Sequence, residues 1–584
     1  MERDKLIAKA KDYLQKENNL HFSKQVETLL AEENWEELND RFYTDLSFGT
    51  GGLRGVIGGG LNRINPYTVR KATQGLANYI LKYAPRDKRR VALAYDSRHF
   101  SDLFAEQAAL VFAGNGIEAH LFTSLRPTPE LSYAVRQLNC CSGVMVTASH
   151  NPAEYNGYKV YWEDGAQITS PHDTGIITEV RAVSEEINVL SRDEAIERKQ
   201  LFMIDESVDI PYLNMVIAQS LRPEMVKEKG KDLKVVYTPL HGCGTIPVET
   251  ALTKMGIQVI TVKEQREPDG AFPTVAFPNP EITSAMQMAL DYAVREKADL
   301  VMGTDPDADR LGIAVPDGDG YTLITGNQLG ALLTDYIFFS RTELGTLPPH
   351  PAFINTIVTT DLQIKIAESY GAATFKVLTG FKFIGEKMRE FEESGSHNYV
   401  FGGEESYGFL VENEVRDKDA VSAATMSAEM ALWNVAQGRT VLDHLNDIYR
   451  RFGYYEESLI SQYFKGQSGQ DVMASLMTKL RSTPPSTLGG VTVTAFKDYQ
   501  EGTTRNLVTS ELDTDIDLPA SNVLQFLLED GSLITARPSG TEPKIKFYAS
   551  ICGEKGLELT EAKKQVSSKI KAIEKDIMAM MPAS

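Results

Sequence analysis

Three times along this chain, short β-prone runs alternate with segments of helical length, and in each series one apolar run leads into a polar loop. The series start at residues 91–95, 233–237 and 353–358. Strands separated by helical lengths are typical of α/β units, so each series predicts an α/β domain with a parallel or mixed sheet. Ligands of such sheets bind beyond the carboxyl ends of the strands. We therefore expect one cleft lined by the loops at residues 147–152, 305–310 and 402–408.

The two ends of the chain depart from this pattern. Leu6, Ala10 and Leu14 recur at helical spacing, which predicts amphipathic helices before the first domain. Beyond the third series, residues 467–470 and 483–486 resemble linkers, and later β-prone runs predict a small α+β domain. The predicted division is a helical extension (1–40), three α/β domains (41–210, 211–335 and 336–458) and a C-terminal domain (459–584).

The composition limits the expected partners and compartment. A formal net charge of −20 argues against nucleic acid and anionic membranes as partners. The four cysteines show neither zinc-site spacing nor a disulfide pattern, so we expect reduced thiols in a cytoplasmic protein. The charged N-terminus does not resemble a signal peptide. The apolar stretch at residues 421–436 is shorter than a membrane span and predicts a buried helix.

Two of the loops carry residues suited to phosphoryl transfer. In the first loop an apolar run leads to Ser149, which we expect on an exposed turn with His150 beside it as an acid/base candidate. The second loop holds three alternating carboxylates, Asp305, Asp307 and Asp309. Oxygen-only ligands favour Mg²⁺ or a similar hard cation. An EF-hand is excluded because the twelfth loop position, which would be a bidentate glutamate, is a proline. A structural role, in which the carboxylates cap a strand-to-helix turn, remains an alternative.

Basic residues inside the motifs carry weight because an acidic protein must gather cations locally to bind a phosphate. Arg310 follows the acidic triplet and suits phosphate binding, unless it pairs with its own aspartates. Lys159 is an acid/base or phosphate-binding candidate, although lysines on strands are often only solvated. The glycine-rich segment 49–55 carries Arg54 and suits contacts with phosphate. It lacks the ending of a P-loop, which argues against a kinase.

Two further loops indicate a sugar phosphate. Residues 537–544 combine an arginine, two hydroxyls, a glycine and a lysine, which form either an anion cradle or a surface turn. Glu404 and Ser406 lie between glycines, and carboxylates repel phosphate but accept hydrogen bonds from sugar hydroxyls. A phosphoryl carrier, a metal site, a hydroxyl-binding loop and a phosphate cradle together predict a phosphosugar ligand.

The motifs Thr-Ala-Ser-His-Asn-Pro, Asp-Pro-Asp-Ala-Asp-Arg, Gly-Glu-Glu-Ser-Tyr-Gly and Arg-Pro-Ser-Gly-Thr-Glu-Pro resemble those of the α-D-phosphohexomutases, in the family's order. The resemblance covers nearly the whole chain. It implies three related α/β domains with mixed sheets and a C-terminal TBP-like α+β domain around a central cleft. It also implies interconversion of glucose 1-phosphate and glucose 6-phosphate through a phosphoserine and glucose 1,6-bisphosphate, with Mg²⁺ as the metal and the bisphosphate as activator.

The same resemblance implies a role for each motif residue. Ser149 is the expected phosphoserine and a ligand of Mg²⁺ together with Asp305, Asp307 and Asp309. The groups expected around the transferring phosphate are Lys159, His150, Arg310 and Arg54. Those expected at the sugar are Glu404, Ser406, Lys382, Thr379 and Gly380. The phosphate that is not transferred is expected at Arg537, Ser539, Gly540 and Thr541.

Details of the motifs bear on the branch of the family. Pro306, Ala308 and the loop at residues 416–419 resemble the branch of phosphoglucomutases that also act on phosphopentoses and of glucose-1,6-bisphosphate synthases. Mannose and pentose phosphates are therefore further expected substrates. A synthase that uses 1,3-bisphosphoglycerate as donor is the alternative. We expect a monomer or weak homodimer without nucleic-acid or membrane partners.

Overall fold

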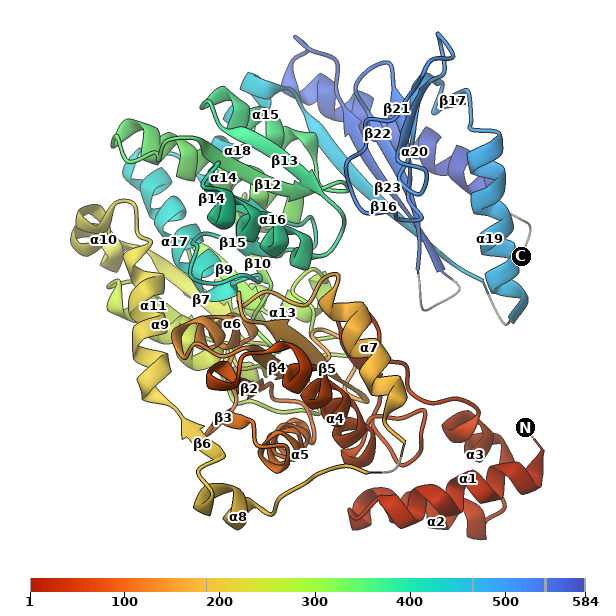
Figure 1. Ribbon diagram of the computed structural model, residues 1–584. Helices are drawn as coiled ribbons and strands as arrows, with labels where there is room; N and C mark the ends of the chain where they lie inside the picture. Colours follow the sequence, from red (N-terminus) through yellow and green to blue (C-terminus); the bar gives the residue numbers. More distant parts are fainter. Residues whose placement is uncertain (1, 185, 465–466, 540–543, 582–584) are drawn as a thin grey trace. The chain divides into compact units, whose positions relative to one another are not determined.

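The computed structural model describes residues 2–184, 186–464, 467–539 and 544–581 (Figure 1). The chain divides into two compact units. The first unit comprises Met1–Gly326 and Phe381–Gly438, and the second comprises Asn327–Gly380 and Arg439–Ser584.

The N-terminal extension is helical, as predicted. It consists of α1 (Arg3–Lys16), α2 (Leu20–Ala31) and α3 (Trp35–Phe42). Leu6, Ala10 and Phe42 are buried in one cluster with Tyr67, which belongs to the first α/β segment. The apolar stripe read from the sequence therefore packs the extension onto the domain that follows.

The first α/β segment forms a mixed six-stranded sheet. Its strand order is β1 (Gly52–Val56), β5 (Tyr155–Trp162), β4 (Ser142–Val146), β2 (Arg90–Tyr95), β3 (Glu118–Phe122) and β6 (Leu201–Ile204). Strands β4, β2, β3 and β6 run parallel, whereas β5 and β1 are antiparallel to their neighbours. Its helices are α4 (Pro66–Tyr83), α5 (Ser101–Gly114), α6 (Thr128–Gln137), α7 (His172–Ala182) and α8 (Arg192–Glu197), with a 3₁₀ turn at Arg86–Lys88.

The second segment repeats this arrangement. Its strand order is β11 (Gly320–Ile324), β10 (Leu311–Asp317), β9 (Leu300–Thr304), β7 (Lys234–Thr238) and β8 (Gln258–Thr261). Here three parallel strands, β9, β7 and β8, are followed by the antiparallel strands β10 and β11. Its helices are α9 (Glu206–Ala218), α10 (Pro223–Lys229), α11 (Thr245–Lys254), α12 (Lys263–Arg266) and α13 (Thr283–Glu296), with a 3₁₀ turn at Gly230–Asp232. The mixed sheets expected for related α/β domains are confirmed.

The third segment contributes to both units. In the first unit lie α16 (Phe381–Ser394), the antiparallel pair β14 (Asn398–Gly403) and β15 (Phe409–Leu410), and α17 (Ala420–Ala436). Every residue of α17 from Ala420 to Asn434 is buried, which confirms the predicted buried helix. In the second unit lie α14 (Gly326–Glu343), the parallel pair β12 (Pro351–Thr356) and β13 (Ala373–Val377), α15 (Asp361–Ser369) and α18 (Val441–Phe452).

The C-terminal part of the second unit is rich in β structure. Its antiparallel sheet runs β16 (Tyr455–Tyr463), β23 (Lys544–Cys552), β22 (Leu533–Pro538), β21 (Leu524–Leu528), β18 (Val491–Asp498), β19 (Thr503–Asn506) and β20 (Leu512–Asp513), with β17 (Thr487–Leu488) paired to β18. Helices α19 (Gln467–Ser482) and α20 (Leu559–Met580) accompany it. The linker predicted at residues 467–470 is wrong, because α19 begins there. Leu476 and Leu480 of α19 are buried in the core, and this burial outweighs the weak helix propensity of Gly469.

Two compositional expectations can be compared with the fold. The four cysteines are unpaired and buried. Within the described residues, no helix combines the length and the apolar character that a membrane span would require.

Candidate active site

The three predicted loops occupy equivalent places in the fold. The serine loop joins β4 to the antiparallel strand β5, and the acidic loop joins β9 to the antiparallel strand β10. The loop at residues 402–408 joins β14 to β15 in the same way. All three lie in the first unit, so the first unit brings together the serine, the carboxylates and the predicted sugar-binding residues of β14–β15.

Ser149 is the residue at which the serine loop turns back. Its φ of +54° lies in the left-handed region, which is uncommon for a residue with a side chain. Its N–H donates to Thr147 Oγ1 at 2.8 Å, and its hydroxyl donates to Asp305 Oδ2 at 3.0 Å. Ser149 is only 4% exposed. The exposed turn predicted from the sequence is therefore wrong, because the acidic loop packs against the hydroxyl.

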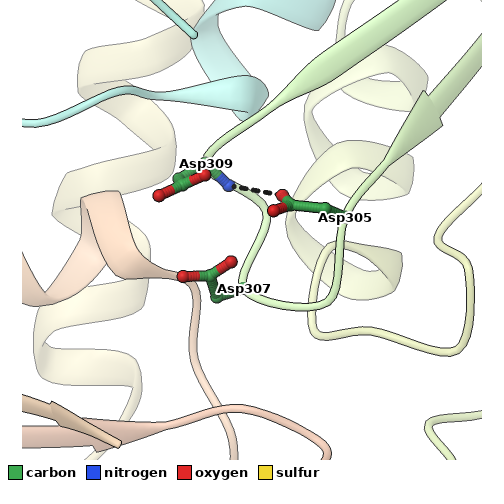
Figure 2. A group of neighbouring side chains, drawn as sticks. All are labelled: Asp305, Asp307 and Asp309. Carbon is green, nitrogen blue, oxygen red and sulfur yellow. Dashed lines mark hydrogen bonds between the residues drawn. The ribbon is translucent and has the colours of Figure 1, made fainter. Parts of the chain in front are cut away.

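The three carboxylates of the acidic loop converge (Figure 2). Asp305, Asp307 and Asp309 are all buried, and one oxygen of each lies within 4.8 Å of the others. Asp305 Oδ1 accepts hydrogen bonds from the backbone N–H groups of Asp309 and Arg310 at 3.2 and 3.1 Å. The loop is thus curled around its first aspartate, and alternate positions direct the other two carboxylates to the same point.

Some carboxylate oxygens of Asp307 and Asp309 have hydrogen-bond or ion-pair partners, and those without a hydrogen-bond partner define a cation site. Asp307 Oδ2 accepts from Thr128 Oγ1 at 2.9 Å and from Lys159 Nζ at 2.8 Å. Asp309 Oδ2 pairs with Lys159 Nζ at 3.4 Å and with Lys418 Nζ at 3.1 Å. Asp307 Oδ1 and Asp309 Oδ1 are buried without a hydrogen-bond partner among the described residues. Such oxygens are costly unless a partner satisfies them, and a hard divalent cation fits this donor set.

Opposed electrostatic effects act within the triplet. Burial and the charges of Asp307 and Asp309 raise the pKa of Asp305 well above its usual range. Burial also disfavours the charge on Asp309, but Lys418 and Lys159 outweigh it and lower the pKa of Asp309. Shifts of opposite sign within one loop are typical of functional sites.

Lys159 lies on β5 with its ammonium group between two aspartates. Its side chain is 13% exposed, so the alternative of a merely solvated lysine does not hold. Burial acts against its charge, but Asp307 and Asp309 outweigh this effect and raise its pKa. Lys159 is therefore a charged donor directed at the acidic loop.

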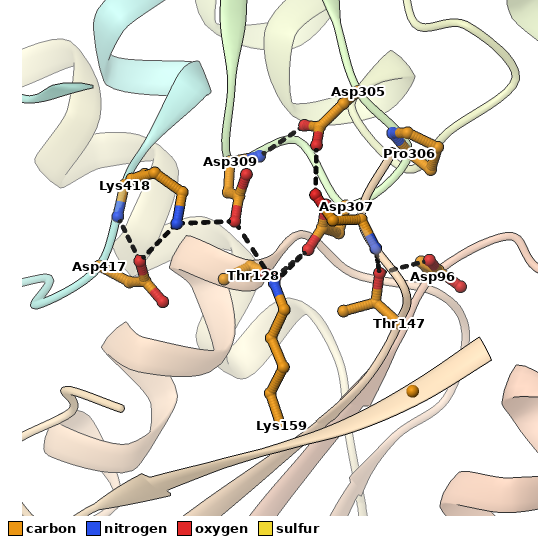
Figure 3. A network of polar contacts seen from close by, with 12 residues as sticks. Asp96, Thr128, Thr147, Lys159, Asp305, Pro306, Asp307, Asp309, Asp417 and Lys418 are labelled. Atoms are coloured by element: carbon orange, nitrogen blue, oxygen red, sulfur yellow. Dashed lines mark hydrogen bonds and ion pairs between the residues drawn. The ribbon is translucent and has the colours of Figure 1, made fainter. Parts of the chain in front are cut away.

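Lys418 and Asp417 also belong to this network, although the sequence analysis did not assign them to the site (Figure 3). Lys418 Nζ lies 3.0 Å from Asp417 Oδ1, and its side chain is 8% exposed. Asp417 Oδ2 accepts from Tyr161 OH and Gln167 Nε2, each at 2.7 Å. The alternating charges of residues 416–419, directly before a buried helix, were the signal that could have identified this pair.

His150 contacts the serine hydroxyl, whereas Arg54 contacts the serine loop at Asn151. His150 Nδ1 is 3.2 Å from Ser149 Oγ. Burial and the charges of Arg310 and Arg54 lower the pKa of His150 well below its usual range, so its ring is neutral at neutral pH. Arg54 is exposed, and its Nη1 lies 3.5 Å from Asn151 Oδ1.

Arg310 is held mainly from outside the triplet. Its Nη1 donates to Glu281 Oε1 at 2.7 Å, whereas its Nε is 3.9 Å from Asp309 Oδ1. The alternative that Arg310 pairs chiefly with its own aspartates does not hold. A guanidinium fixed by Glu281 beside the carboxylates is preorganised for an anion.

The loop at residues 402–408 presents Glu404, which is buried, and Ser406, which is half-buried. A Cβ at Gly408 would lie 2.1 Å from Lys418 Cδ, so the last glycine of this motif leaves room for the lysine stem. Lys382 Nζ donates to the carbonyl oxygen of Thr50 at 3.2 Å, and burial lowers its pKa.

Four predicted residues with described coordinates belong to the second unit: Thr379, Gly380, Arg537 and Ser539. Arg537 lies on β22 opposite Lys546, and the N–H of Ser539 donates to the carbonyl oxygen of Lys544 at 2.7 Å. The predicted phosphate-binding residues Gly540 and Thr541 lie outside the described residues.

Comparison with known proteins places this site in a family context. The chain matches the models for phosphoglucomutase/phosphomannomutase α/β/α domains I, II and III over residues 45–186, 211–318 and 325–452. It is 37% identical to a phosphoglucomutase of Staphylococcus aureus (strain MRSA252) over 556 residues, covering 94% of this chain and 96% of the relative. It is also 37% identical to a phosphoglucomutase of Staphylococcus haemolyticus over 514 residues, covering 87% and 91%.

Solved structures show the same fold at lower identity. The exocytosis-sensitive phosphoprotein pp63/parafusin of Paramecium, a phosphoglucomutase, aligns with a TM-score of 0.68 at 20% identity, covering 92% of this chain and 96% of that one. A putative phosphomannomutase of Thermus thermophilus aligns with a TM-score of 0.67 at 21% identity, covering 92% and 99%.

Proposed function

This chain belongs to the phosphoglucomutase/phosphomannomutase family, and on that premise we propose that it interconverts glucose 1-phosphate and glucose 6-phosphate through phosphorylated Ser149. The observation that carries the proposal is the contact of the Ser149 hydroxyl with Asp305, 3.0 Å apart, inside a buried carboxylate triplet that fits a divalent cation. A hydroxyl next to a metal site is suited to carrying a phosphoryl group, because the cation offsets the charge of that group.

In the proposed reaction the bond between the phosphorus and Ser149 Oγ breaks as a bond forms to the free hydroxyl oxygen of the sugar phosphate. The sugar hydroxyl loses a proton, and Ser149 Oγ regains one. Glucose 1,6-bisphosphate results. After the intermediate turns over, its other phosphoryl group returns to Ser149, and the second monophosphate leaves.

The residues of the first unit divide these tasks. Lys159, kept charged by two aspartates, is the proposed acid/base and donates a hydrogen bond to the phosphate, with Arg310, Arg54 and neutral His150 around the transferring group. Mg²⁺, held by Asp305, Asp307, Asp309 and Ser149, would supply charge neutralisation at that group.

The remaining residues are assigned to the sugar and its second phosphate. We assign sugar contacts to Glu404, Ser406, Lys382, Thr379 and Gly380. We assign the phosphate that is not transferred to Arg537, Ser539, Gly540 and Thr541. Because the two phosphates exchange roles in each cycle, a cradle based on charge and hydroxyl donors can accept either one.

The finer expectations are part of the same proposal. They include glucose 1,6-bisphosphate as the activator, mannose and pentose phosphates as further substrates, a cytoplasmic location, and a monomer or weak homodimer. The synthase alternative has no support from the relatives, since those with 37% identity are named phosphoglucomutases.

The test compares turnover of glucose 1-phosphate, mannose 1-phosphate and ribose 1-phosphate, with catalytic glucose 1,6-bisphosphate, in the wild type, Ser149→Ala and Ser394→Ala. Ser394 is an exposed serine of the same unit and serves as the control. We expect Ser149→Ala to lose turnover, and its serine loop to yield no phosphopeptide. We expect chelation of divalent cations to abolish turnover by the wild type. Full activity of Ser149→Ala would refute the mechanism.

A further inference from the structure

The backbone of the serine loop folds around one guanidinium group. Arg98 lies between β2 and α5 and is 2% exposed. Its Nη1 donates to the carbonyl oxygens of Pro152 and Tyr155 at 2.8 and 3.0 Å. Its Nη2 donates to the carbonyl oxygen of Ser149 at 2.5 Å and to that of Asn151. One side chain thus donates to four carbonyl groups, three in the serine loop and that of Tyr155 at the start of β5.

Asp96 fixes the guanidinium in turn. The side chains of Asp96 and Arg98 are fully buried and form an ion pair of 3.4 Å. Asp96 Oδ1 accepts from Ser101 Oγ at 2.8 Å. Its Oδ2 accepts from Thr147 Oγ1 at 2.6 Å (Figure 3). Because Thr147 Oγ1 also accepts from the N–H of Ser149, the backbone of Ser149 is held on both sides. Its N–H reaches Asp96 through Thr147, and its carbonyl oxygen reaches Arg98.

This double support matches a conformation that would not persist alone. The left-handed backbone of Ser149 is unfavourable for a residue with a Cβ, and such outliers persist where the surroundings over-determine them. Buried carbonyl groups also need donors. A planar guanidinium offers several donors in a fixed array, whereas a lysine ammonium is a compact group that cannot reach the same set.

We propose that Arg98 is a positioning residue for phosphoryl transfer: it holds the serine loop so that Ser149 Oγ faces the acidic loop. The proposal rests on the proposed role of Ser149 as the phosphoryl carrier. Arg98 bonds to backbone carbonyls and pairs with Asp96, and none of these contacts involves the serine hydroxyl. Its loss therefore lowers the rate of transfer and leaves substrate binding in place.

The experiment uses the full chain with Arg98→Lys as the main variant, because lysine keeps the charge opposite Asp96 but loses the array of donors. Arg70→Lys is the control: Arg70 is also buried, donates to the carbonyl oxygen of Lys16 at 3.1 Å and lies near the acid Glu17. The measurements are kcat, KM and the single-turnover rate at which glucose 1,6-bisphosphate phosphorylates Ser149.

We expect Arg98→Lys to lose about 100-fold in kcat and in the phosphorylation rate, with KM within about threefold of the wild type, since displacement by about 1 Å costs such a factor. Arg70→Lys should keep both rates. In folded Arg98→Ala, millimolar guanidinium should restore part of the rate. Unchanged phosphorylation in Arg98→Lys, a change confined to KM, or no rescue of folded Arg98→Ala would overturn the proposal. If Ser149→Ala stays active, the function itself fails, which separates the two results.

Discussion

Removal of the Lys418 charge gives the sharpest test of the electrostatics of this site. Lys418 Nζ lies 3.1 Å from Asp309 Oδ2 and 3.0 Å from Asp417 Oδ1, and its side chain is 8% exposed. Methionine keeps the unbranched stem that passes Gly408 but removes the ammonium group. Lys418→Met therefore leaves the buried carboxylates of Asp309 and Asp417 with less positive charge to compensate them.

The expected cost follows from the contacts that remain. Breaking a buried ion pair by removing one partner costs about 3–5 kcal/mol. Asp417 keeps donors from Tyr161 and Gln167, and Asp309 keeps Lys159. We therefore expect the low end, about 3 kcal/mol, without divalent cation. A bound divalent cation restores positive charge beside Asp309, so Mg²⁺ should recover roughly 1–3 kcal/mol of this loss.

The assay is urea unfolding followed by tryptophan fluorescence, with EDTA or with Mg²⁺. The chain has three tryptophans, Trp35, Trp162 and Trp433, and all belong to the first unit, so the signal reports the unit that holds Lys418. Lys71→Met is the control, because Lys71 pairs with Asp45 at 3.0 Å at the surface and should cost at most about 1 kcal/mol. An equal deficit with and without Mg²⁺, or a deficit no larger than that of Lys71→Met, would refute the reasoning.

Three more outcomes are expected. In Gly52→Ala the added Cβ would lie 1.8 Å from a backbone oxygen of β5, at a φ of +131°, so we expect a loss of at least about 3 kcal/mol in the free energy of unfolding, measured in urea. In the control Gly51→Ala the nearest atom is 3.6 Å from the added Cβ, so its stability should match that of the wild type. Equal stabilities of the two variants would contradict this prediction. Thr128→Val removes a hydrogen-bond donor to Asp307. We expect it to weaken Mn²⁺ binding about tenfold, as measured by electron paramagnetic resonance. Unchanged affinity would show that this donor does not orient the carboxylate. Burial raises the pKa of Glu457 from 4.5 to about 7, so the contribution of the protonated carboxyl to stability is complete below pH 4.5 and is lost as the pH rises through 7. In calorimetry Glu457→Gln should therefore match the wild type at about pH 4.5 and be more stable than the wild type at about pH 8. Parallel pH profiles of the two proteins would contradict the shift.

Much of the fold was predictable because its signals are local. Apolar runs such as residues 143–146 and 300–303 became β4 and β9, since β-prone runs between helical lengths select α/β structure. The polar loops that follow them were identified for the same reason. The linker predicted at residues 467–470 was wrong because glycine and polar residues weaken a helix only locally, whereas the burial of Leu476 and Leu480 stabilises α19 through the sheet.

The candidate site was predictable in its reacting groups but not in their support. Ser149, the acidic triplet and Lys159 stand in motifs with chemical meaning. Arg98 contacts carbonyl groups 51 to 57 residues away in the sequence, and Lys418 contacts Asp309, 109 residues away. Local patterns can mark such residues, as the charges of residues 416–419 do, but they do not identify these distant partners. Asp96 and Arg98 do follow β2 as Ser149 follows β4, so the rule about strand ends could have marked them.

The sequence by itself identified the candidate side chains for phosphate, metal and sugar, and their place after strand ends, because residue chemistry and hydrophobic periodicity are properties of short segments. Only the tertiary structure decided that the Ser149 hydroxyl is buried against Asp305, and that Asp307 and Asp309 each keep one oxygen without a hydrogen-bond partner among the described residues. Those properties depend on the approach of loops far apart in the chain. Burial and charge compensation arise from that approach, and they set the Ser149 hydroxyl beside carboxylates that fit a divalent cation.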